Sequence, residues 1–497
     1  MLRKVRLTLA ILFFIAITGL FLDFTGTLHA WLGWTAKLQF LPALLAMNVG
    51  VVIFLVLLTL LVGRVYCSVI CPLGVMQDIV SWVSGSRKKK KYRFSYSPAK
   101  NWLRYGVLAL FVVAMVLGIS SVVALLAPYS AYGRIATNLL APIYRQGNNL
   151  LAYFAERADS YAFYDVDVWM KGAATLAVAI GTFIIIAILA WRGGRTYCNT
   201  ICPVGTVLGF LSRFSLLRVT IDSSKCNHCG LCSRRCKASC INGSDHTIDY
   251  SRCVACMDCI DTCNHGAIGL TLRRKKSETG DDKPIDTSRR TFIALAAATA
   301  ATAGTAALKS EEKAVDGGLA VIEEKKIPRR ATPIVPPGAR SLRHMARHCT
   351  ACQLCVSACP NGVLRPSTRF DTLMQPEVSY ERGYCRPECT RCSEVCPAGA
   401  IIKITTAEKS AIHIGHAVWV KENCVPLTDG VECGNCARHC PVGAIQMVPS
   451  EPGNDASPRI PVVDTERCIG CGACENLCPA RPFSAIYVEG HERHRVM

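Results

Sequence analysis

Hydrophobic residues gather in four long runs within the first 220 residues of the chain. These runs cover roughly Leu7–Leu22, Leu38–Val62, Leu103–Ala127 and Gly172–Trp191. Each is close to the ~20 apolar residues that an α-helix needs to cross a bilayer. No small-residue cleavage site follows the first run, and a second run comes soon after it, which favours a membrane helix over a signal peptide. The pattern therefore predicts a four-helix membrane domain over residues 1–220.

A fifth uncharged stretch, Ser288–Leu308, is of a different kind. Arg289 and Arg290 precede a segment made mostly of Ala and Thr, which is less hydrophobic than the four runs. This arrangement resembles a twin-arginine export signal, which carries folded cargo across the membrane. Ala301–Ala303 is a candidate cleavage site, so both a released and an anchored second half are consistent with the sequence. The alternative is a soluble Ala-rich helix.

Charge is distributed unevenly along the chain, whose formal net charge is +20. Residues 1–308 contain 33 Lys and Arg against 15 Asp and Glu, whereas residues 309–497 contain 23 against 21. The predicted loop from Gly63 to Trp102 is strongly basic, which places that loop, the N-terminus and the chain from residue 192 onward in the cytoplasm. Lys88–Lys91 is the only run that suits nucleic acid, and we expect no nucleic-acid partner.

The membrane domain contains an internal repeat. Gly-Arg-Val-Tyr-Cys67-Ser-Val-Ile-Cys71-Pro-Leu-Gly follows the second run, and Gly-Arg-Thr-Tyr-Cys198-Asn-Thr-Ile-Cys202-Pro-Val-Gly follows the fourth, with eight of twelve positions identical. Two hairpins of the same orientation predict a pseudo-two-fold axis along the membrane normal. Cysteines four apart lie on one face of a helical turn, so the two pairs together would offer four thiolates to one iron–sulfur cluster. Structural or redox-active thiols are the alternative.

Most of the 29 cysteines occur in short spacings that are typical of metal ligands. Residues 221–270 contain the bacterial ferredoxin spacing twice, in which three thiolates hold one cubane and the fourth reaches the other cluster. One [4Fe–4S] cluster is therefore expected on Cys226, Cys229, Cys232 and Cys263, and a second on Cys253, Cys256, Cys259 and Cys236. Structural zinc is the alternative. Lys237 and Asn264 replace the usual proline, and we interpret the extra Cys240 as a spare thiol.

Four more cysteine sets follow a charged and Pro-rich tether over residues 309–345, and each set ends in Cys-Pro. The sets are Cys349, Cys352, Cys355 and Cys359; Cys385, Cys389, Cys392 and Cys396; Cys424, Cys433, Cys436 and Cys440; and Cys468, Cys471, Cys474 and Cys478. They predict four [4Fe–4S] clusters, for a total of about six, with a seventh at the C-x-x-x-C-P motifs left open. The sequence does not decide whether the sets pair in order or the first pairs with the fourth.

These motifs carry a family resemblance. Residues 1–270 resemble the NapH family of membrane ferredoxins, with four spans, two C-x-x-x-C-P motifs and two ferredoxin motifs. Residues 288–497 resemble the NapG/MauM-type exported ferredoxins with four clusters. The resemblance implies a fusion of the two, acting as a quinol dehydrogenase module. It would take electrons from the membrane quinol pool and pass them to a periplasmic cytochrome or molybdenum-type reductase, such as a nitrate reductase.

The predicted architecture is an α-helical membrane domain of four spans plus one signal-anchor helix, with α+β bacterial-ferredoxin-like domains. We expect the membrane domain at 1–220, a cytoplasmic two-cluster domain at 221–270, a linker with the signal at 271–345, and a periplasmic four-cluster domain at 346–497. The protein would then reside in a bacterial inner membrane. The sequence does not identify a catalytic acid or base.

Two other functions fit parts of the sequence. The first is a metal-handling maturation or regulatory membrane ferredoxin, and the second is a wholly cytoplasmic polyferredoxin docked to the membrane. The main hypothesis also has a gap, because about 30 Å of hydrocarbon would separate the inner and outer clusters. The predicted spans contain no ligand for a carrier, so the quinone pool, a docking partner, or a quinol site in the third loop (Pro128–Lys171) would have to close it.

Overall fold

Four helices carry the apolar runs, but only two of them are continuous over the expected length. The computed structural model describes residues 2–87, 94–272 and 323–496, so the stretch Ser288–Leu308 lies outside the described residues. Among the described helices, α1 (Leu2–Leu22) and α12 (Ala173–Gly193) are the two that are long and apolar enough to cross a membrane. Helices α5 (Val49–Val62) and α8 (Asn101–Leu117) are apolar but shorter.

The other two apolar runs are broken, which corrects the expectation of one helix per run. The second run forms α4 (Phe40–Leu45) and α5, separated at Met47, whose φ is 54°, while the Asn48 side chain caps α5 by accepting from the Val51 amide. The third run ends α8 at Gly118, with φ 75°, and restarts as α9 (Ser120–Leu126). A residue in the left-handed region ends a helix because it turns the chain away from the helical path.

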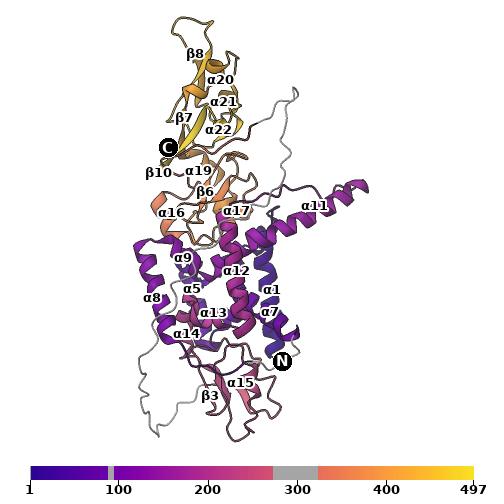
Figure 1. Cartoon of the computed structure of the whole chain (residues 1–497). Coiled ribbons are helices and arrows are strands. Elements are labelled where there is room, and N and C mark those ends of the chain that lie inside the picture. The colour runs from indigo at the N-terminus through magenta and orange to yellow at the C-terminus, as the bar shows by residue number, and fades with distance from the viewer. Residues whose placement is uncertain (1, 88–93, 273–322, 497) are drawn as a thin grey trace, which may run out of the picture. The chain divides into compact units, whose positions relative to one another are not determined.

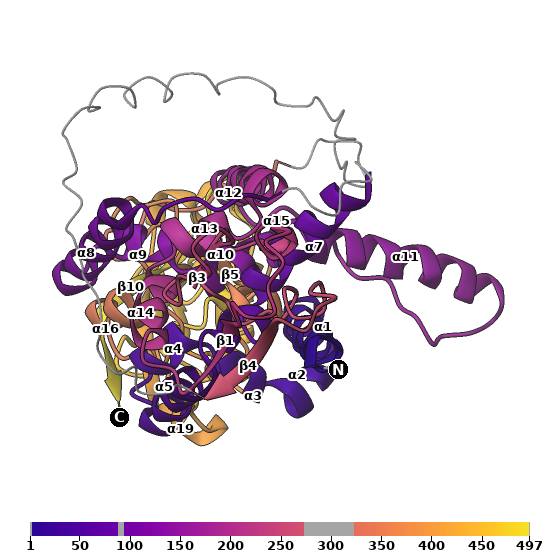
Figure 2. The same cartoon turned by 90° about the horizontal axis from the view of Figure 1, so that it is seen from below.

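Other helices connect or follow these four. They are α2 (Thr27–Leu32), α3 (Trp34–Lys37), α6 (Val65–Val69), α7 (Pro72–Arg87), α10 (Pro128–Ile135), a π-helical turn η1 (Ala136–Leu140), α11 (Ala141–Arg157), α13 (Thr196–Thr200) and α14 (Pro203–Ser212). The axes of α1, α8 and α12 are roughly aligned, with α12 antiparallel to the other two (Figure 1). Viewed along their axes, they lie around α10 and α13 (Figure 2).

Two ferredoxin-like blocks are built from short helices and two-stranded antiparallel sheets. The inner block, residues 217–272, contains β1 (Leu217–Ile221), α15 (Leu231–Arg235), β2 (Ile241–Asn242), β3 (Thr247–Ile248) and β4 (Ile268–Leu272). Its main sheet pairs Leu217 with Leu272 and Ile221 with Ile268. Cysteine-bearing loops therefore lie between two strands that close the block at its ends.

The outer block, residues 325–496, is built in the same way around four cysteine sets, twice as many as the inner block. Its helices are α16 (Leu342–His348), α17 (Leu354–Ala358), α18 (Arg391–Val395), α19 (Thr406–Ala411), the 3₁₀ turn η2 (Lys421–Asn423), α20 (Val425–Thr428), α21 (Asn435–Arg438) and α22 (Ala473–Leu477). Its strands are β5 (Leu364–Pro366), β6 (Pro376–Val378), β7 (Ile412–Trp419), β8 (Ile445–Pro449), β9 (Arg459–Val463) and β10 (Ile486–Val496). They pair as β5–β6, β7–β10 and β8–β9.

The ordered outer block begins earlier than the predicted boundary at residue 346. The Lys325 ammonium donates to the carbonyls of Glu475, Asn476 and Cys478, and the Arg330 guanidinium pairs with the buried Glu475 carboxylate. The described part of the tether is therefore packed against the block that it precedes.

One contiguous core joins the helical part, the inner block and the first half of the outer block. It includes Ile17 of α1, Val254 of the inner block, and Leu354 and Ile401 of the outer block. The second half of the outer block has a core of its own around Ala417 and Ile486.

Candidate functional site

The two C-x-x-x-C-P motifs fold in the same way, residue for residue. The first glycine of each motif ends a long helix with a positive φ, 82° at Gly63 and 67° at Gly194. A one-turn helix follows, α6 or α13, and the Cys-Pro dipeptide then begins α7 or α14. Proline is favoured at the first position of a helix because its missing N–H has no partner there in any case.

The two arginines of the repeat cross over, each binding the other motif. The Arg195 guanidinium donates to the Cys67 carbonyl over 2.7 Å, and the Arg64 guanidinium donates to the Cys198 carbonyl over 3.1 Å. Both arginines are fully buried. Each motif thus makes the same hydrogen bond to the other, as expected for two copies related by a pseudo-two-fold axis.

The last glycine of each motif makes the crossing possible. A Cβ on Gly74 would lie 2.2 Å from the Cys67 carbonyl oxygen, and one on Gly205 would lie 2.3 Å from the Cys198 carbonyl oxygen. The arginines occupy the same space, at 2.5 Å from the Gly74 position and 2.8 Å from the Gly205 position. A side chain at either position would therefore overlap a carbonyl of its own motif and displace the arginine that the other motif sends to it.

The four motif cysteines are buried in a strongly cationic environment. Cys67, Cys71, Cys198 and Cys202 are each about 4% exposed. Donors approach the sulfurs: the Gln77 amide lies 3.2 Å from the Cys198 Sγ, and the Gly205 N–H lies 3.3 Å from the Cys202 Sγ. Hydrogen bonds to sulfur are one means by which proteins tune an iron–sulfur cluster.

Charge balance indicates that this site is built for an anion. Asp78 binds Arg195 through both carboxylate oxygens, at 2.8 and 2.7 Å. Among the described residues, no carboxylate lies within ion-pair distance of Arg64, which instead contacts Asn199, Ser251 and the motif cysteines. A buried cation is costly unless it is paired. Four thiolates around a cluster would supply the negative charge that Arg64 lacks, so the residues present fit such a group.

The part of the chain that the structure describes contains no compact single-ion site. Within the described ranges, no three His, Cys, Asp or Glu side chains converge closely enough to hold one metal ion. A cubane spreads its four ligands farther apart than a single ion does. The finding therefore argues against a zinc-like site and leaves the cluster sites unaffected.

The inner block brings its cysteines together in two groups. Cys226, Cys229, Cys232 and Cys263 line one pocket. The thiol of Cys259 lies among those of Cys253, Cys256 and Cys236. These are the two quartets that the sequence assigns to the inner clusters.

Cys240 occupies a position that the sequence did not explain. It is 1% exposed, its Sγ lies 3.5 Å from that of Cys236, and it also contacts the thiol of Cys253. It therefore lies between two cysteines of the second inner quartet.

Lys237 explains one missing proline. Its ammonium bridges Asp78 of α7, at 3.0 Å, and Asp258 of the inner block, at 3.1 Å, while its carbonyl accepts from the Arg195 N–H. Arg6 of α1 also pairs with Asp78. Lys237 thus joins the inner block to α7 through its ammonium, a contact that a proline could not make, and to the second C-x-x-x-C-P motif through its carbonyl.

The four outer sets group in sequence order, first with second and third with fourth. Cys349, Cys352 and Cys355 share a pocket with Cys396, while Cys359 lies with Cys385, Cys389 and Cys392. Cys424, Cys433 and Cys436 share a pocket with Cys478, while Cys440 lies with Cys468, Cys471 and Cys474. Each set therefore sends its last cysteine to its neighbour, as in a two-cluster ferredoxin.

The second and fourth cysteine sets of the outer block are in direct contact. The Cys385 N–H donates to the Cys471 carbonyl over 2.9 Å, and the Tyr380 hydroxyl donates to the Gly470 carbonyl over 2.5 Å. A Cβ on Gly472 would overlap the Tyr380 ring, which shows how closely the halves approach. The Cys385 loop, in the second set, thus faces the Cys471 loop, in the fourth set.

Comparisons with known proteins agree with these groupings. A model described as a 4Fe–4S binding domain matches residues 44–91 and 175–221, which hold the C-x-x-x-C-P motifs, and one described as a 4Fe–4S dicluster domain matches residues 348–400 and 431–481. The methylamine utilization ferredoxin-type protein MauM of Methylophilus methylotrophus is 31% identical over 171 residues, covering 32% of this chain and 72% of MauM. This chain belongs to the MauM-like ferredoxin-type proteins.

Other ferredoxin-type relatives are more distant. The ferredoxin-type protein MauN of Methylobacillus flagellatus is 27% identical over 238 residues, covering 47% of this chain and 70% of MauN. The ferredoxin-type protein NapH of Escherichia coli is 24% identical over 242 residues, covering 47% of this chain and 70% of NapH. No solved structure matches the chain. The prediction of an iron–sulfur, ferredoxin-type electron-transfer protein with 4Fe–4S domains is confirmed.

Sequence reasoning missed several functional residues. Arg64, Arg195 and the last glycine of each motif were inside the repeated twelve residues, and their identity in both copies was the available signal. The helix α10 gave no such signal, because Tyr129, Ser130 and Arg134 read as a polar loop. In the structure all eight α10 residues are buried.

Proposed function

We propose that this ferredoxin-type protein is a membrane-bound quinol dehydrogenase module that carries electrons from the quinol pool to a periplasmic reductase of the nitrate-reductase type. One observation carries the proposal: three apolar helices each have one end at the inner block and the other at the outer block. The two blocks would then lie on opposite sides of the membrane.

Helix α1 illustrates this arrangement. Arg3, at its start, pairs with Asp258 of the inner block at 2.9 Å, and Thr25 and Gly26, beyond its end, accept hydrogen bonds from Arg391 of the outer block. At 1.5 Å per residue, the 21 residues of α1 extend about 30 Å, the thickness of the hydrocarbon core.

Helices α8 and α12 also have one end at each block. Arg104 near the start of α8 donates to Ser251 of the inner block, while Ser120 and Ser121 beyond its end donate to carbonyls of residues 371 and 370 in the outer block. Lys171, just before α12, donates to the Val356 carbonyl of the outer block, and Arg195, just after it, donates through its N–H to the Lys237 carbonyl of the inner block.

The surface between the blocks suits lipid. Large apolar side chains point outward from the long helices, among them Leu12 and Ile15 of α1, Val116 of α8 and Ile185 of α12. Aromatic side chains such as Trp31, Trp34, Trp82 and Trp102 are also exposed near helix ends. Apolar belts bordered by tryptophan are typical of membrane proteins.

The cysteine quartets would hold seven clusters, six in the ferredoxin blocks and one at Cys67, Cys71, Cys198 and Cys202. When bound, such clusters accept and release single electrons. The chain's own part is to hold the thiolates, to exclude water from the motif site, and to neutralise its charge with Arg64 and Arg195. The match of the 4Fe–4S binding model to the two motif segments supports the seventh centre.

A hollow in the third loop is a candidate quinol site. It has a volume of about 560 Å³, lies at the end of α11, and is lined by Tyr153, Glu156, Tyr161 and Asp165, with other residues of the same loop. Exposed Leu151 and Phe154 give α11 an apolar face next to it. Quinol oxidation releases two protons, for which the two carboxylates are the available acceptors.

Glu156→Gln tests this assignment. Because a positioned general base contributes about 10²–10⁴-fold to a proton-transfer step, we expect cluster reduction by quinol to slow by about a hundredfold or more. Reduction by dithionite should not change. Asp159→Asn, on the same loop but outside the lining of the hollow, is the matched control. Equal quinol kinetics in both variants would place the quinol site elsewhere.

Two experiments test the overall proposal: reduction of the clusters by quinol, and reporter fusions that determine the membrane topology. Purified full-length protein should show cluster bleaching on addition of menaquinol or ubiquinol, and a maturation or regulatory protein should not. Fusions of a periplasm-only reporter after residues 270 and 345 should be active only at the second position, and Arg289→Lys with Arg290→Lys should abolish that activity. Activity at neither position would favour a wholly cytoplasmic protein and exclude the proposed topology.

A further inference from the structure

A buried segment of the third loop, Ala127–Leu140, lies between the C-x-x-x-C-P motifs and the outer block. It contains α10 and the π-turn η1, and its α10 residues are buried although four of them carry a polar group. Irregular backbone at membrane depth is tolerated where it is enclosed by protein. One face of this segment contacts the loop that carries Cys352, and the other face lies next to the second C-x-x-x-C-P motif.

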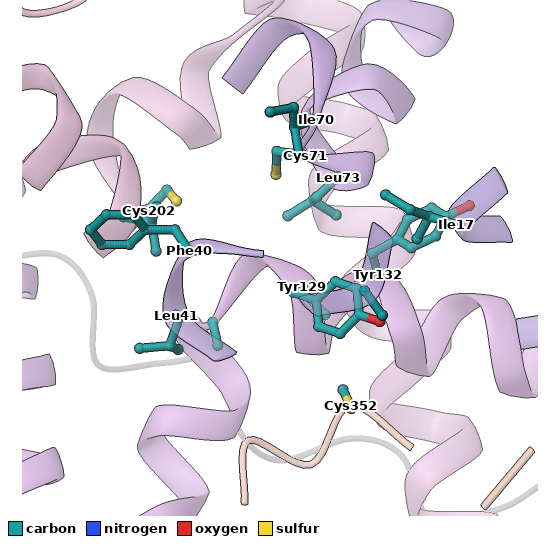
Figure 3. Packing of buried hydrophobic residues seen from close by; sticks show 14 of the residues in the cluster. Ile17, Phe40, Leu41, Ile70, Cys71, Leu73, Tyr129, Tyr132, Cys202 and Cys352 are labelled. Carbon is teal, nitrogen blue, oxygen red and sulfur yellow. The ribbon is translucent and has the colours of Figure 1, made fainter. Parts of the chain in front are cut away.

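The outer face of the segment contacts the loop that carries Cys352. A Cβ on Gly133 would lie 2.3 Å from the Cys352 carbonyl oxygen, so the α10 backbone is in direct contact with that loop. The buried Asn138 amide donates to the Gln353 side chain over 2.9 Å. Figure 3 shows the Tyr129 ring on the side of α10 that faces Cys352. The thiols of Cys352 and Cys396 act electrostatically on the Tyr129 hydroxyl, which has no hydrogen-bond partner among the described residues.

The inner face of the segment contacts the second motif. Tyr197, which directly precedes Cys198, donates its hydroxyl over 3.2 Å to the carbonyl of Leu126, the residue just before the segment. Tyr197 is buried within electrostatic reach of Cys198, Cys202 and Arg134. One short helix is therefore all that separates the motif cysteines from the Cys352 loop. A helix with its side chains is about 10–12 Å across.

On the cytoplasmic side, the motif site is joined to the inner block just as closely. Arg64 donates to the carbonyls of Cys198 and Ser251, at 3.1 and 3.0 Å, and Ser251 is two residues before Cys253. Asn199 donates to the Ala238 carbonyl, two residues after Cys236. The loops that carry the second inner quartet therefore touch the loops that carry the motif cysteines.

We propose that α10 is the bridge across which electrons pass between the motif cysteines and the quartet of Cys349, Cys352, Cys355 and Cys396, without help from quinone. This inference rests on the proposed function, because it requires the cysteine sites to hold clusters. Each step moves one electron from a reduced centre to an oxidised one, with no bond made or broken and no proton transferred. The gap noted from the sequence would be closed by the chain itself.

Vesicles can test the bridge directly. Full-length protein is inserted into quinone-free liposomes that contain trapped ferricyanide, and dithionite is added outside. Bleaching of ferricyanide, above the rate for protein-free liposomes, measures electron flow across the membrane in either orientation of the protein. We expect flow in quinone-free vesicles. Flow that requires added quinone would overturn the proposal.

A matched glycine pair tests α10 itself. Gly133→Ala places a methyl group against the Cys352 carbonyl and should slow the flow several-fold by moving α10 away from that loop. Gly106→Ala, in α8, meets nothing within 4 Å and should conduct like the parent protein. Equal rates in the two variants, with equal iron content, would overturn the proposal.

Electron paramagnetic resonance supplies a readout that does not depend on flow or on the folding of the glycine variant. In the parent protein, the signal of the Cys349-containing quartet should be broadened by a paramagnetic neighbour at the motifs. Cys71→Ala with Cys202→Ala should remove that broadening and lower the iron content by one cluster. Iron loss without any change in broadening would refute the bridge but keep the seventh centre. Unchanged iron would refute the centre, and quinol-dependent reduction of the remaining clusters tests the proposed function separately.

Discussion

At the scale of single residues, Cys240 shows how a spare thiol can act on a cluster that it does not hold. Its Sγ lies 3.5 Å from that of Cys236 and contacts Cys253 as well. Hydrogen bonds to ligand sulfurs stabilise the reduced, more negative state of a cluster and so raise its potential. We therefore expect Cys240→Ala to lower the midpoint potential of the second inner cluster, with Cys240→Ser intermediate, in a redox titration followed by paramagnetic resonance.

The other clusters of the same sample serve as internal controls for this measurement, since their potentials should not move. Loss of the second inner cluster in Cys240→Ala would show instead that Cys240 is a ligand. An unchanged midpoint potential in Cys240→Ala would show that Cys240 is a spare thiol with no effect on the cluster.

Asp78 is the residue on which the inner junction depends. It pairs with Arg195, Arg6 and Lys237, all largely buried. Removing one partner of a buried ion pair costs about 3–5 kcal/mol. Asp78→Asn should destabilise the protein by an amount of that order in thermal or denaturant unfolding. Asp222→Asn, which breaks the exposed pair with Lys225, should cost less than about 1 kcal/mol.

The pH dependence of Asp78 has a definite sign. Burial alone would raise its pKa, but the charges of Arg195 and Lys237 hold the pKa of Asp78 below its ordinary value. A lowered pKa contributes stability that is present above the unfolded pKa of about 3.9 and is lost as pH falls through the folded value. The parent protein should thus lose stability below about pH 4 more steeply than Asp78→Asn. Parallel pH profiles for the two proteins would contradict the assignment.

At the scale of elements, the repeated motif works as a pair of interlocked turns. Gly205 approaches the Cys198 carbonyl and Arg64 so closely that an added Cβ would clash with backbone. Gly205→Ala should therefore separate the turns and lower the iron content by about one cluster, with the six ferredoxin clusters retained. Gly181→Ala, in α12, meets nothing within 4 Å and should leave the iron content unchanged. Full iron in Gly205→Ala would mean that the motifs hold no cluster or do not need the crossing.

The elements also show what the sequence could and could not predict. The x2-x2-x3 spacing predicted the inner quartets because a ferredoxin loop is a local structure that its own cysteines define. The broken runs were missed because hydrophobicity does not register a single left-handed residue such as Met47 or Gly118. Helix α10 was missed because its burial comes from segments far away in the chain, which include α12 and the Cys352 loop.

At the scale of the whole molecule, the contacts place the cysteine sites in one sequence. The inner block joins the motifs through Arg64, and the motifs face Cys352 across α10. Within the outer block, Cys355 lies near Cys392, Cys385 touches Cys471, and Cys474 lies near Cys436. The quartets containing Cys349, Cys385, Cys468 and Cys424 should then be reduced in that order, which differs from their order in the chain.

This order can be tested by deleting one quartet at a time. Cys389→Ala with Cys392→Ala removes the only quartet that touches the far half of the outer block among the described contacts. When electrons are supplied at the inner face and samples are freeze-quenched, the quartets of Cys468 and Cys424 should stay oxidised.

Cys433→Ala with Cys436→Ala is the matched control, because it removes the last site in the sequence and should leave the other three outer quartets reducible. Reduction of the Cys468 quartet at the parent rate in the first variant would mean that electrons reach the far half by another route. The proposed acceptor should then dock near the quartet of Cys424, Cys433, Cys436 and Cys478, since that site comes last and Cys433 and Cys436 are partly exposed.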